Sequence, residues 1–294
     1  MSNVPYFNHK EIGPRTWQIG YNYTDKGFLF CYLIEGDDYA LVIDTMNGYG
    51  NLRAYVETLT DKPIKLFNTH YHFDHTGGNF DFDSCYMHPA DIALFYDSKG
   101  RTQEQMLERA RAEALPEYKD AMEASDFCKI REMKVYPVND GDIFDLGGRR
   151  LEAVEVGGHT PGCMVLIDDA LRIAYTGDAC NDNTLMSSPA ALSVEKYLKN
   201  LLRFKHYASR FDIMYGGHIV LDPVIIDEGI ELCGRVLAGT DDHEERPGFM
   251  GRVNIYGAHH STTTIFREDG KTFNISYNPE HLWDEGPKHQ VIRL

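Results

Sequence analysis

Long apolar runs are missing from this sequence. No window approaches the roughly 18 uninterrupted apolar residues that a membrane-spanning helix needs. The first ten residues also lack the basic stretch and the apolar stretch that make up a secretion signal. We therefore expect a cytoplasmic protein that does not enter a membrane.

Basic residues are few. The 294-residue chain has 29 Lys and Arg against 45 Asp and Glu, which gives a formal net charge of -16. No block of Lys or Arg interrupts this pattern, and an acidic surface repels phosphate backbones and anionic lipid heads. We expect no nucleic-acid partner and favour a small-molecule substrate.

Closely spaced cysteines are also absent. The six cysteines are scattered without a C-x-x-C pair, which excludes a zinc ribbon or a thioredoxin-like motif and predicts free, mostly buried thiols. No linker of low complexity and no repeat divides the chain, whose apolar content of 43% is ample for a large core. We expect a single domain over residues 1–294.

Strand and helix patterns alternate along the chain. Sheets with helices on their outer faces, an α/β (α+β) arrangement, are therefore expected, with further strands over about residues 252–294 and a turn at 268–270. The earlier strands are predicted over residues 16–20, 28–34, 39–44, 64–69, 134–138, 150–156, 164–168, 172–176 and 212–215. The helices are predicted over residues 51–60, 193–206 and 224–238.

A helical insertion is predicted over about residues 91–128. Met106, Ala110 and Ala114 recur in it at helical spacing. The segment is longer than an ordinary connection, so we interpret it either as a lid over a pocket or as a helical cover for the sheet. Its aromatic side chains would line a pocket wall or form a homodimer contact, and they include Phe95, Tyr96 and Tyr118.

Four metal-competent side chains follow the predicted strand 64–69. The stretch is His70-x-His72-x-Asp74-His75. Alternate residues of an extended segment project to one side, so His70, His72 and Asp74 can converge while a turn re-aims His75. A single histidine here would more often be structural, but three histidines and an aspartate at this spacing indicate a metal site.

This stretch resembles the signature of the metallo-β-lactamase superfamily. Three further motifs of that family occur in order, each just past a predicted strand: Gly158-His159-Thr160-Pro161-Gly162, Thr176-Gly177-Asp178 and Gly217-His218. The resemblance covers about residues 15–220. It implies a four-layer αββα sandwich with metal ions at one edge.

The resemblance also implies a ligand set for two metal ions. The ligands would be His70, His72 and His159 for the first ion, Asp74, His75 and His218 for the second, and Asp178 as a bridge between the two. Imidazole and carboxylate ligands suit zinc, although iron and manganese accept the same set. We predict two Zn²⁺ ions.

Two neighbouring metal ions indicate a hydrolase that uses a bridging hydroxide as its nucleophile. Asp74 would orient that hydroxide and carry a proton to the leaving group. The Thr-Gly-Asp sequence at Asp178 resembles glyoxalase II and the acyl-homoserine lactonases. Hydrolysis of a carboxyl ester, thioester or lactone is therefore the leading hypothesis, with a β-lactam or amide left open. A local charge near +1 favours a carboxylate-bearing substrate.

Two other activities of the same superfamily are alternatives. A phosphodiesterase or nuclease, as in RNase Z, uses similar ligands but would need a basic surface that the composition does not offer. A mono-iron sulfur dioxygenase would use one metal and only part of the ligand set. A binding module without activity is disfavoured, because a degenerate site would be expected to lose ligands.

Two residues outside the ligand set are further candidates. Asp44 ends a predicted strand and could accept the free ring N–H of a liganding histidine, or it could cap the turn that follows. His260 could border the substrate pocket, although a single histidine is seldom a ligand. His88 is expected to be buried or to anchor a turn.

Overall fold

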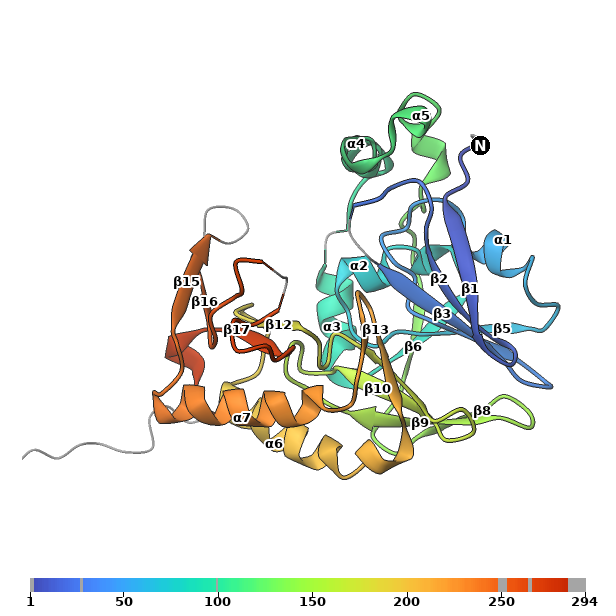
Figure 1. Cartoon of the computed structure of the whole chain (residues 1–294). Helices are drawn as coiled ribbons and strands as arrows, with labels where there is room; N and C mark the ends of the chain where they lie inside the picture. The colour runs from blue at the N-terminus through green and yellow to red at the C-terminus, as the bar shows by residue number, and fades with distance from the viewer. Residues whose placement is uncertain (1–2, 27–28, 99, 248–252, 264–265, 285–294) are drawn as a thin grey trace, which may run out of the picture.

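Two β-sheets lie face to face at the centre of the structure, and helices cover the outer face of each (Figure 1). The computed structural model describes residues 3–26, 29–98, 100–247, 253–263 and 266–284. This is the αββα sandwich expected from the motifs, so the predicted fold class is confirmed. A third, smaller sheet lies beside the sandwich, next to helix α7 (Figure 1).

The first sheet has seven strands in sequential order. Its first four strands form an antiparallel meander, and the remaining strands add in parallel. The strands are β1 (Phe7–Gly13), β2 (Thr16–Tyr21), β3 (Phe30–Glu35), β4 (Ala40–Ile43), β5 (Ile64–Phe67), β6 (Ser84–Met87) and β7 (Lys134–Pro137).

The second sheet has six strands in the order β14-β13-β11-β10-β9-β8. Its strands are β8 (Ile143–Asp145), β9 (Arg150–Glu155), β10 (Met164–Asp168), β11 (Ile173–Gly177), β13 (Ile213–Gly216) and β14 (Val220–Leu221). The third sheet joins the C-terminal strands to one earlier strand in the order β12-β17-β16-β15. These strands are β12 (Asn183–Met186), β15 (Glu244–Pro247), β16 (Val253–Tyr256) and β17 (Asn274–Tyr277).

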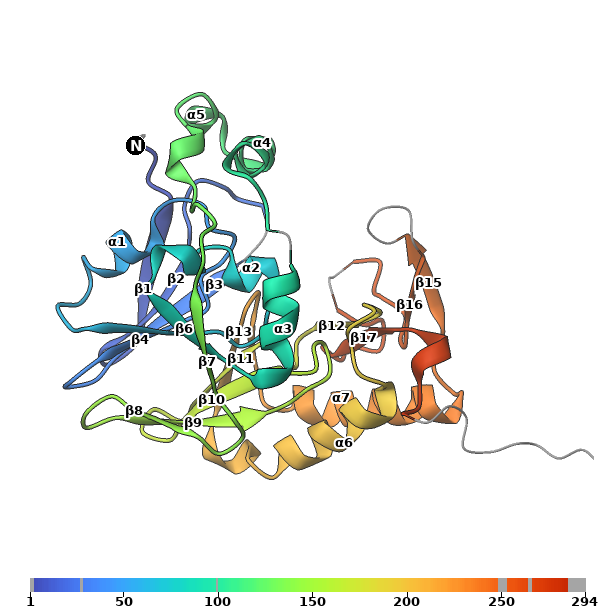
Figure 2. The ribbon, with the colours of Figure 1, turned by 180° about the vertical axis from the view of Figure 1, so that it is seen from behind.

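The helices fall into three groups (Figure 2). Helices α1, α2 and α3 accompany the first sheet, α6 and α7 cover the second, and α4 and α5 project from one end of the molecule. Their bounds are α1 (Leu52–Val56), α2 (Phe73–Thr76), α3 (Pro89–Asp97), α4 (Gln103–Glu113), α5 (Pro116–Lys119), α6 (Val194–Lys205) and α7 (Ile225–Ala238).

Alternation along the central strands explains why their sequences are apolar throughout. In β10, Met164 and Leu166 face the first sheet, while Val165 and Ile167 face the core beneath α6 and α7. Successive side chains of a strand point to opposite faces, so a strand between two apolar layers needs apolar residues at every position. The uninterrupted apolar run over residues 164–167 of β10 therefore marks a central strand.

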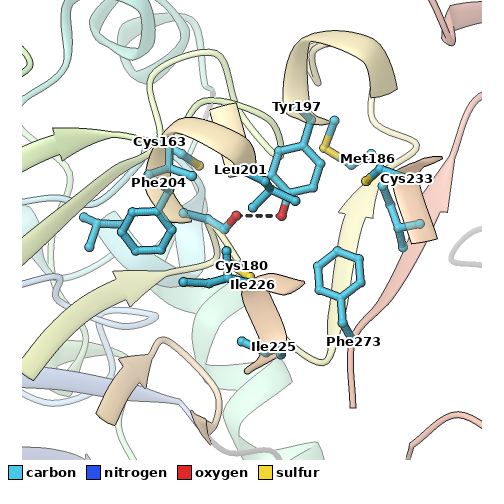
Figure 3. Close-up of a cluster of buried hydrophobic side chains, with 14 of the residues drawn as sticks. Cys163, Cys180, Met186, Tyr197, Leu201, Phe204, Ile225, Ile226, Cys233 and Phe273 are labelled. Atoms are coloured by element: carbon cyan, nitrogen blue, oxygen red, sulfur yellow. Dashed lines mark hydrogen bonds between the residues drawn. The ribbon is translucent and has the colours of Figure 1, made fainter. Parts of the chain in front are cut away.

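The core between the second sheet and its helices is built mainly from α6 and α7 (Figure 3). Tyr197, Leu201 and Phe204 lie on one face of α6, at the spacing of three and four residues that places side chains side by side on a helix. Figure 3 shows them packed with Ile226 and Cys233 of α7. All six cysteines of the chain are buried and free, as the sequence predicted.

The insertion predicted over about residues 91–128 contains most of α3, followed by α4 and α5. We call its later part, residues 101–128, the cap. A capping box starts α4, because the Thr102 and Gln105 side chains each accept a hydrogen bond from the other residue's backbone N–H. The helical pattern that includes Met106, Ala110 and Ala114 is divided in the structure into α4, α5 and a turn at Ala124–Asp126. Pro116 explains the break, since proline cannot continue the preceding helix.

Several elements differ from the sequence prediction. Strands β1, β6, β8, β12, β14 and β15 were not expected, and the helix predicted over residues 51–60 ends at Val56. The turn at residues 268–270 is present, but β17 begins only at Asn274. Residues 285–294 of the predicted C-terminal strands lie outside the described residues. No helix among the described residues combines the length and apolar character needed to cross a membrane.

A buried ion pair connects the two sheets. Arg149 donates to the buried Asp168 carboxylate at the end of β10 and, over 2.8 Å, to the Thr16 hydroxyl in β2. Arg149→Met would leave the charge of Asp168 buried without its partner, which we expect to lower the free energy of unfolding by about 3–5 kcal/mol in urea denaturation. The double variant with Asp168→Asn should recover part of that loss, and equal instability of the single and double variants would contradict this explanation.

Candidate metal centre

Four loops at one edge of the two sheets bring together the seven predicted ligands. His70 and His72 follow β5, and Asp74 and His75 lie in α2. The other three lie in loops of the second sheet: His159 between β9 and β10, Asp178 just after β11, and His218 between β13 and β14. Each motif therefore lies just past a strand, as expected.

The ligand atoms form overlapping groups within 4.8 Å of one another. The groups are His70, His72 and His159; His70, His75 and Asp178; and Asp74, His75 and His218. In the first group Nε2 of His159 lies 2.8 Å from Nδ1 of His72. The first and third groups are the two sets that the sequence assigned to separate metal ions.

Asp178 lies between these two sets. Its Oδ2 is 3.7 Å from Nε2 of His159, 3.6 Å from Nε2 of His75 and 3.3 Å from Nε2 of His218. One carboxylate oxygen is thus close to imidazoles of both sets. This is the position that a bridging ligand requires.

Buried polar atoms that lack a hydrogen-bond partner point into the cluster. Among the described residues, these atoms include Nε2 of His70, Nε2 of His75 and Oδ1 of Asp178. Burying such atoms unpaired costs free energy, so native proteins rarely leave them without a partner. Lone pairs of imidazole and carboxylate groups converging in this way fit divalent metal ions.

The outward ring nitrogens are held by hydrogen bonds. Nδ1 of His75 lies 2.8 Å from the buried carboxylate of Asp44, and Nδ1 of His159 lies 2.7 Å from the backbone oxygen of Leu185. An acceptor at Nδ1 fixes the proton there and leaves Nε2 free to bind a metal. Asp44 thus contacts a predicted ligand in the way that the sequence suggested.

Asp44 also holds the strand end that carries His70. Its carboxylate accepts from the backbone N–H of Thr69 over 2.8 Å and from the Thr69 hydroxyl over 2.7 Å. Its backbone has φ of +61°, a strained conformation for a residue other than glycine. The three hydrogen bonds that converge on this carboxylate compensate for that strain.

The electrostatics of the cluster divide its histidines into two kinds. Burial and neighbouring imidazoles lower the pKa of His70 well below its usual value, and burial together with His159 lowers the pKa of His72 to about 3. Burial also acts on His218, but the Asp178 carboxylate outweighs it and raises the pKa of His218 to about 9. The Asp178 carboxylate favours a proton on the His218 imidazole. A bound metal ion would take the place of that proton.

A buried carboxylate that the sequence analysis missed joins two of the ligand loops. Asp91 in α3 accepts from the backbone N–H of Tyr71 over 3.0 Å, the Thr160 hydroxyl over 2.7 Å and the backbone N–H of Gly162 over 2.7 Å. Tyr71 lies between two predicted ligands, and Thr160 follows His159. Asp91 therefore fixes the position of His159 relative to the first loop.

Helix α6 supports the loops that carry His159 and Asp178. The Tyr197 hydroxyl, labelled in Figure 3, donates over 2.8 Å to the backbone oxygen of Ala179, next to Asp178. The Asn200 side chain donates over 2.6 Å to the backbone oxygen of Gly157. A side chain at Gly158 would collide with the Tyr197 ring, so glycine is needed for this close packing.

A cavity of about 600 Å³ opens beside the cluster and contains Asp74 and His218 in its wall. Arg101, Arg109 and Glu113 of the cap line it, so the cap borders the pocket in the way that the lid hypothesis expects. The rest of its lining is Tyr21, Tyr23, Thr24, Lys26, Leu29, Asn47, Phe73 and Leu185.

Other residues singled out in the sequence lie outside this lining. His260 hydrogen-bonds Glu244 over 2.5 Å and does not line the described cavity, so its substrate contact stays a prediction. His88 accepts from the backbone N–H of Ala90 at the start of α3, which is the expected turn-anchoring role. Phe95 and Tyr96 line a separate cavity, of about 410 Å³.

An αββα sandwich with imidazole and carboxylate groups gathered at one sheet edge defines the class of metal-dependent hydrolases. Comparison with known families agrees, because the model of the metallo-β-lactamase superfamily matches residues 24–218. The chain belongs to this superfamily and is a hydrolase. The membership predicted from the four motifs is confirmed.

The most similar curated relatives include thioesterases. The human acyl-coenzyme A thioesterase MBLAC2 is 27% identical over 199 residues, which cover 63% of this chain and 71% of that protein. The atrochrysone carboxyl ACP thioesterase AacuM of Aspergillus aculeatus is 27% identical over 227 residues, covering 76% of this chain and 59% of that protein.

A solved structure supports the fold. The metallo-β-lactamase from Pontibacter korlensis superposes with a TM-score of 0.56 at 16% identity, covering 78% of this chain and 99% of that one. At this level of identity the likeness supports the architecture alone.

Replacing Asp91 should test its link between the ligand loops. Asn offers one acceptor oxygen for the three donors, so we expect Asp91→Asn to weaken divalent-metal affinity about 10- to 100-fold in a chelator competition titration. Asp168→Asn is the matched control, because it neutralises another buried carboxylate away from the cluster. If Asp91→Asn retained the original metal affinity, the positioning role would be wrong.

Proposed function

We propose that this chain hydrolyses acyl thioesters at a site that holds two divalent metal ions. The thioesterase relatives and the predicted ester, thioester or lactone chemistry support the reaction. The convergence of buried, unpaired ligand atoms next to the cavity supports the metal site and is the observation that carries the proposal. Zinc as the metal, a cytoplasmic location and a homodimer stay predictions from the sequence.

Two ligand sets would share Asp178. They are His70, His72 and His159 on one side and Asp74, His75 and His218 on the other. Bound divalent ions would supply a water of lowered pKa and a Lewis acid for the thioester carbonyl. The protein's part is to hold these ligands rigidly, through Asp44, Asp91 and Tyr197, so that little reorganisation is needed during the reaction.

Asp74 has a second role in this proposal. Its side chain is 40% exposed, whereas that of Asp178 is 11% exposed, and only Asp74 of these two carboxylates lines the cavity. Its Oδ2 lies 3.5 Å from Nε2 of His218. A carboxylate between the ligand cluster and the cavity can orient a water molecule and transfer a proton to the departing thiolate.

The apolar part of the cavity wall suits an acyl group. Leu29, Phe73 and Leu185 line it together with the rings of Tyr21 and Tyr23. Apolar walls with a few polar groups at one end are typical of small-molecule sites, in which the polar groups fix the orientation. The reactive carbonyl would then lie beside Asp74, with the acyl group against these walls.

The same arrangement distinguishes the proposal from its alternatives. A sulfur dioxygenase would use one iron and part of the ligand set, whereas here both predicted sets converge and Asp178 lies between them. A nuclease would need a large basic surface, which a net charge of -16 disfavours.

A substrate screen tests the proposed reaction. We expect the zinc-loaded protein to hydrolyse acyl thioesters faster than lactones, β-lactams or phosphodiesters, as measured by release of free thiol or acid. Activity should disappear on treatment with a chelator and return on addition of zinc. Preferred hydrolysis of phosphodiesters, or thioester hydrolysis that survives complete metal removal, would contradict the proposal.

Replacing Asp74 with Asn separates proton transfer from metal binding. The amide keeps one weak oxygen ligand but carries no proton at neutral pH, so turnover should fall about 10²- to 10⁴-fold at matched metal occupancy. The loss should be largest for alkyl esters, whose leaving groups are strongly basic, and smaller for thioesters and aryl esters. An equal loss for all leaving groups would show that Asp74 acts only as a ligand.

A further inference from the structure

Three cationic side chains line the cavity beside Asp74, although the chain as a whole is strongly acidic. They are Lys26 from the segment after β2, Arg101 from the start of the cap, and Arg109 from α4. The described lining contains two carboxylates, and one of them, Asp74, belongs to the proposed metal site. Apart from Asp74, the charged side chains of the described lining therefore carry a net positive charge, with three cations against Glu113.

Arg101 is held close to the metal loop. Its guanidinium carbon lies 4.6 Å from the centroid of the Phe73 ring, and Phe73 directly precedes Asp74. A cation over an aromatic face is attracted to the ring without losing its hydrogen-bond donors. Arg101 thus offers N–H groups to a ligand near the inner end of the cavity.

Arg109 extends the cationic surface outward along α4. Arg101 lies two residues before the first residue of α4 and Arg109 lies six residues after it, so the helical rise alone separates them by roughly 9 Å along the helix axis. Its Nε is 3.5 Å from a carboxylate oxygen of Glu113, a loose pair whose side chains are 45% and 34% exposed. A guanidinium has five N–H donors, so this contact leaves most of them for a ligand.

Hydrogen bonds and packing hold the cap, which carries Arg101 and Arg109, against the segment after β2, which carries Lys26. The backbone N–H of Leu115 donates over 2.8 Å to the backbone oxygen of Tyr23. The Thr24 hydroxyl donates over 2.8 Å to the backbone oxygen of Glu113. Met106 and Ala110 of α4 are buried in the hydrophobic cluster that includes Tyr23. The cap therefore presents its arginines from a fixed position.

We propose that Lys26, Arg101 and Arg109 bind the phosphate groups of the thiol carrier, which makes coenzyme A thioesters the substrate class. The inference rests on the proposed thioesterase function. A ligand with one carboxylate would need only one bidentate guanidinium. Three cations spread over roughly 9 Å are better matched to a long ligand that carries several phosphates. The flexible pantetheine arm would connect those phosphates to the thioester beside Asp74.

Kinetics with two thioesters of the same acyl group test this assignment. Acyl-coenzyme A carries the phosphates, and acyl-pantetheine has the same thioester without them. Arg109→Gln should raise KM for acyl-coenzyme A about tenfold, the size expected for one charge-assisted hydrogen bond at a partly exposed site, and leave KM for acyl-pantetheine unchanged. Salt should raise KM for acyl-coenzyme A only.

Two further variants sharpen the test. Glu113→Gln removes the carboxylate that competes for Arg109, so it should lower KM for acyl-coenzyme A, the opposite direction. Arg150→Gln is the matched control, because it removes an exposed arginine of β9 that does not line the described cavity. An Arg109→Gln effect of equal size on both thioesters, or none on either, would overturn the phosphate assignment.

Binding of 3′,5′-ADP distinguishes failure of this inference from failure of the proposed function. Calorimetry on the metal-loaded protein should show binding that weakens in Arg109→Gln and in Arg101→Gln. If the protein hydrolysed neither thioester but bound 3′,5′-ADP through these arginines, the thioesterase proposal would be wrong and the phosphate site right. Hydrolysis of both thioesters with equal KM, without 3′,5′-ADP binding, would refute the phosphate site alone.

Discussion

The hydrogen bonds that converge on the Asp44 carboxylate are the interaction on which the metal centre depends. This buried group receives the backbone N–H and hydroxyl of Thr69 and lies against Nδ1 of His75. It therefore fixes the end of β5, the start of the ligand loop and the orientation of one imidazole at once. The strained backbone of Asp44 is consistent with this role, because functional sites often retain conformations that cost free energy elsewhere.

The sequence identified the side chains that the fold brings together because their signal is local. His70, His72, Asp74 and His75 lie within six residues, and the other motifs each follow a recognisable strand. Asp91 and Tyr197 were missed because their partners are distant in sequence, with Gly162 lying 71 residues from Asp91. The polar, mostly exposed β1 was missed because an edge strand needs no apolar alternation.

The cationic cavity would reconcile an acidic protein with the anionic substrate that we propose. Sequence composition argued against polyanions, and no block of basic residues was visible, because Lys26, Arg101 and Arg109 are dispersed along the chain. The fold gathers them in the wall of one cavity. A repulsive exterior with a cationic pocket would disfavour nucleic acids while admitting a small phosphorylated thioester, since local charge in a pocket can outweigh net charge at close range.

We propose that two metal ions share the seven convergent side chains. Anomalous diffraction from zinc-soaked crystals at the zinc absorption edge measures this directly. We expect two peaks, one coordinated by His70, His72 and His159 and the other by Asp74, His75 and His218, with Asp178 in contact with both. A single peak at full occupancy, or peaks that do not contact these residues, would contradict it.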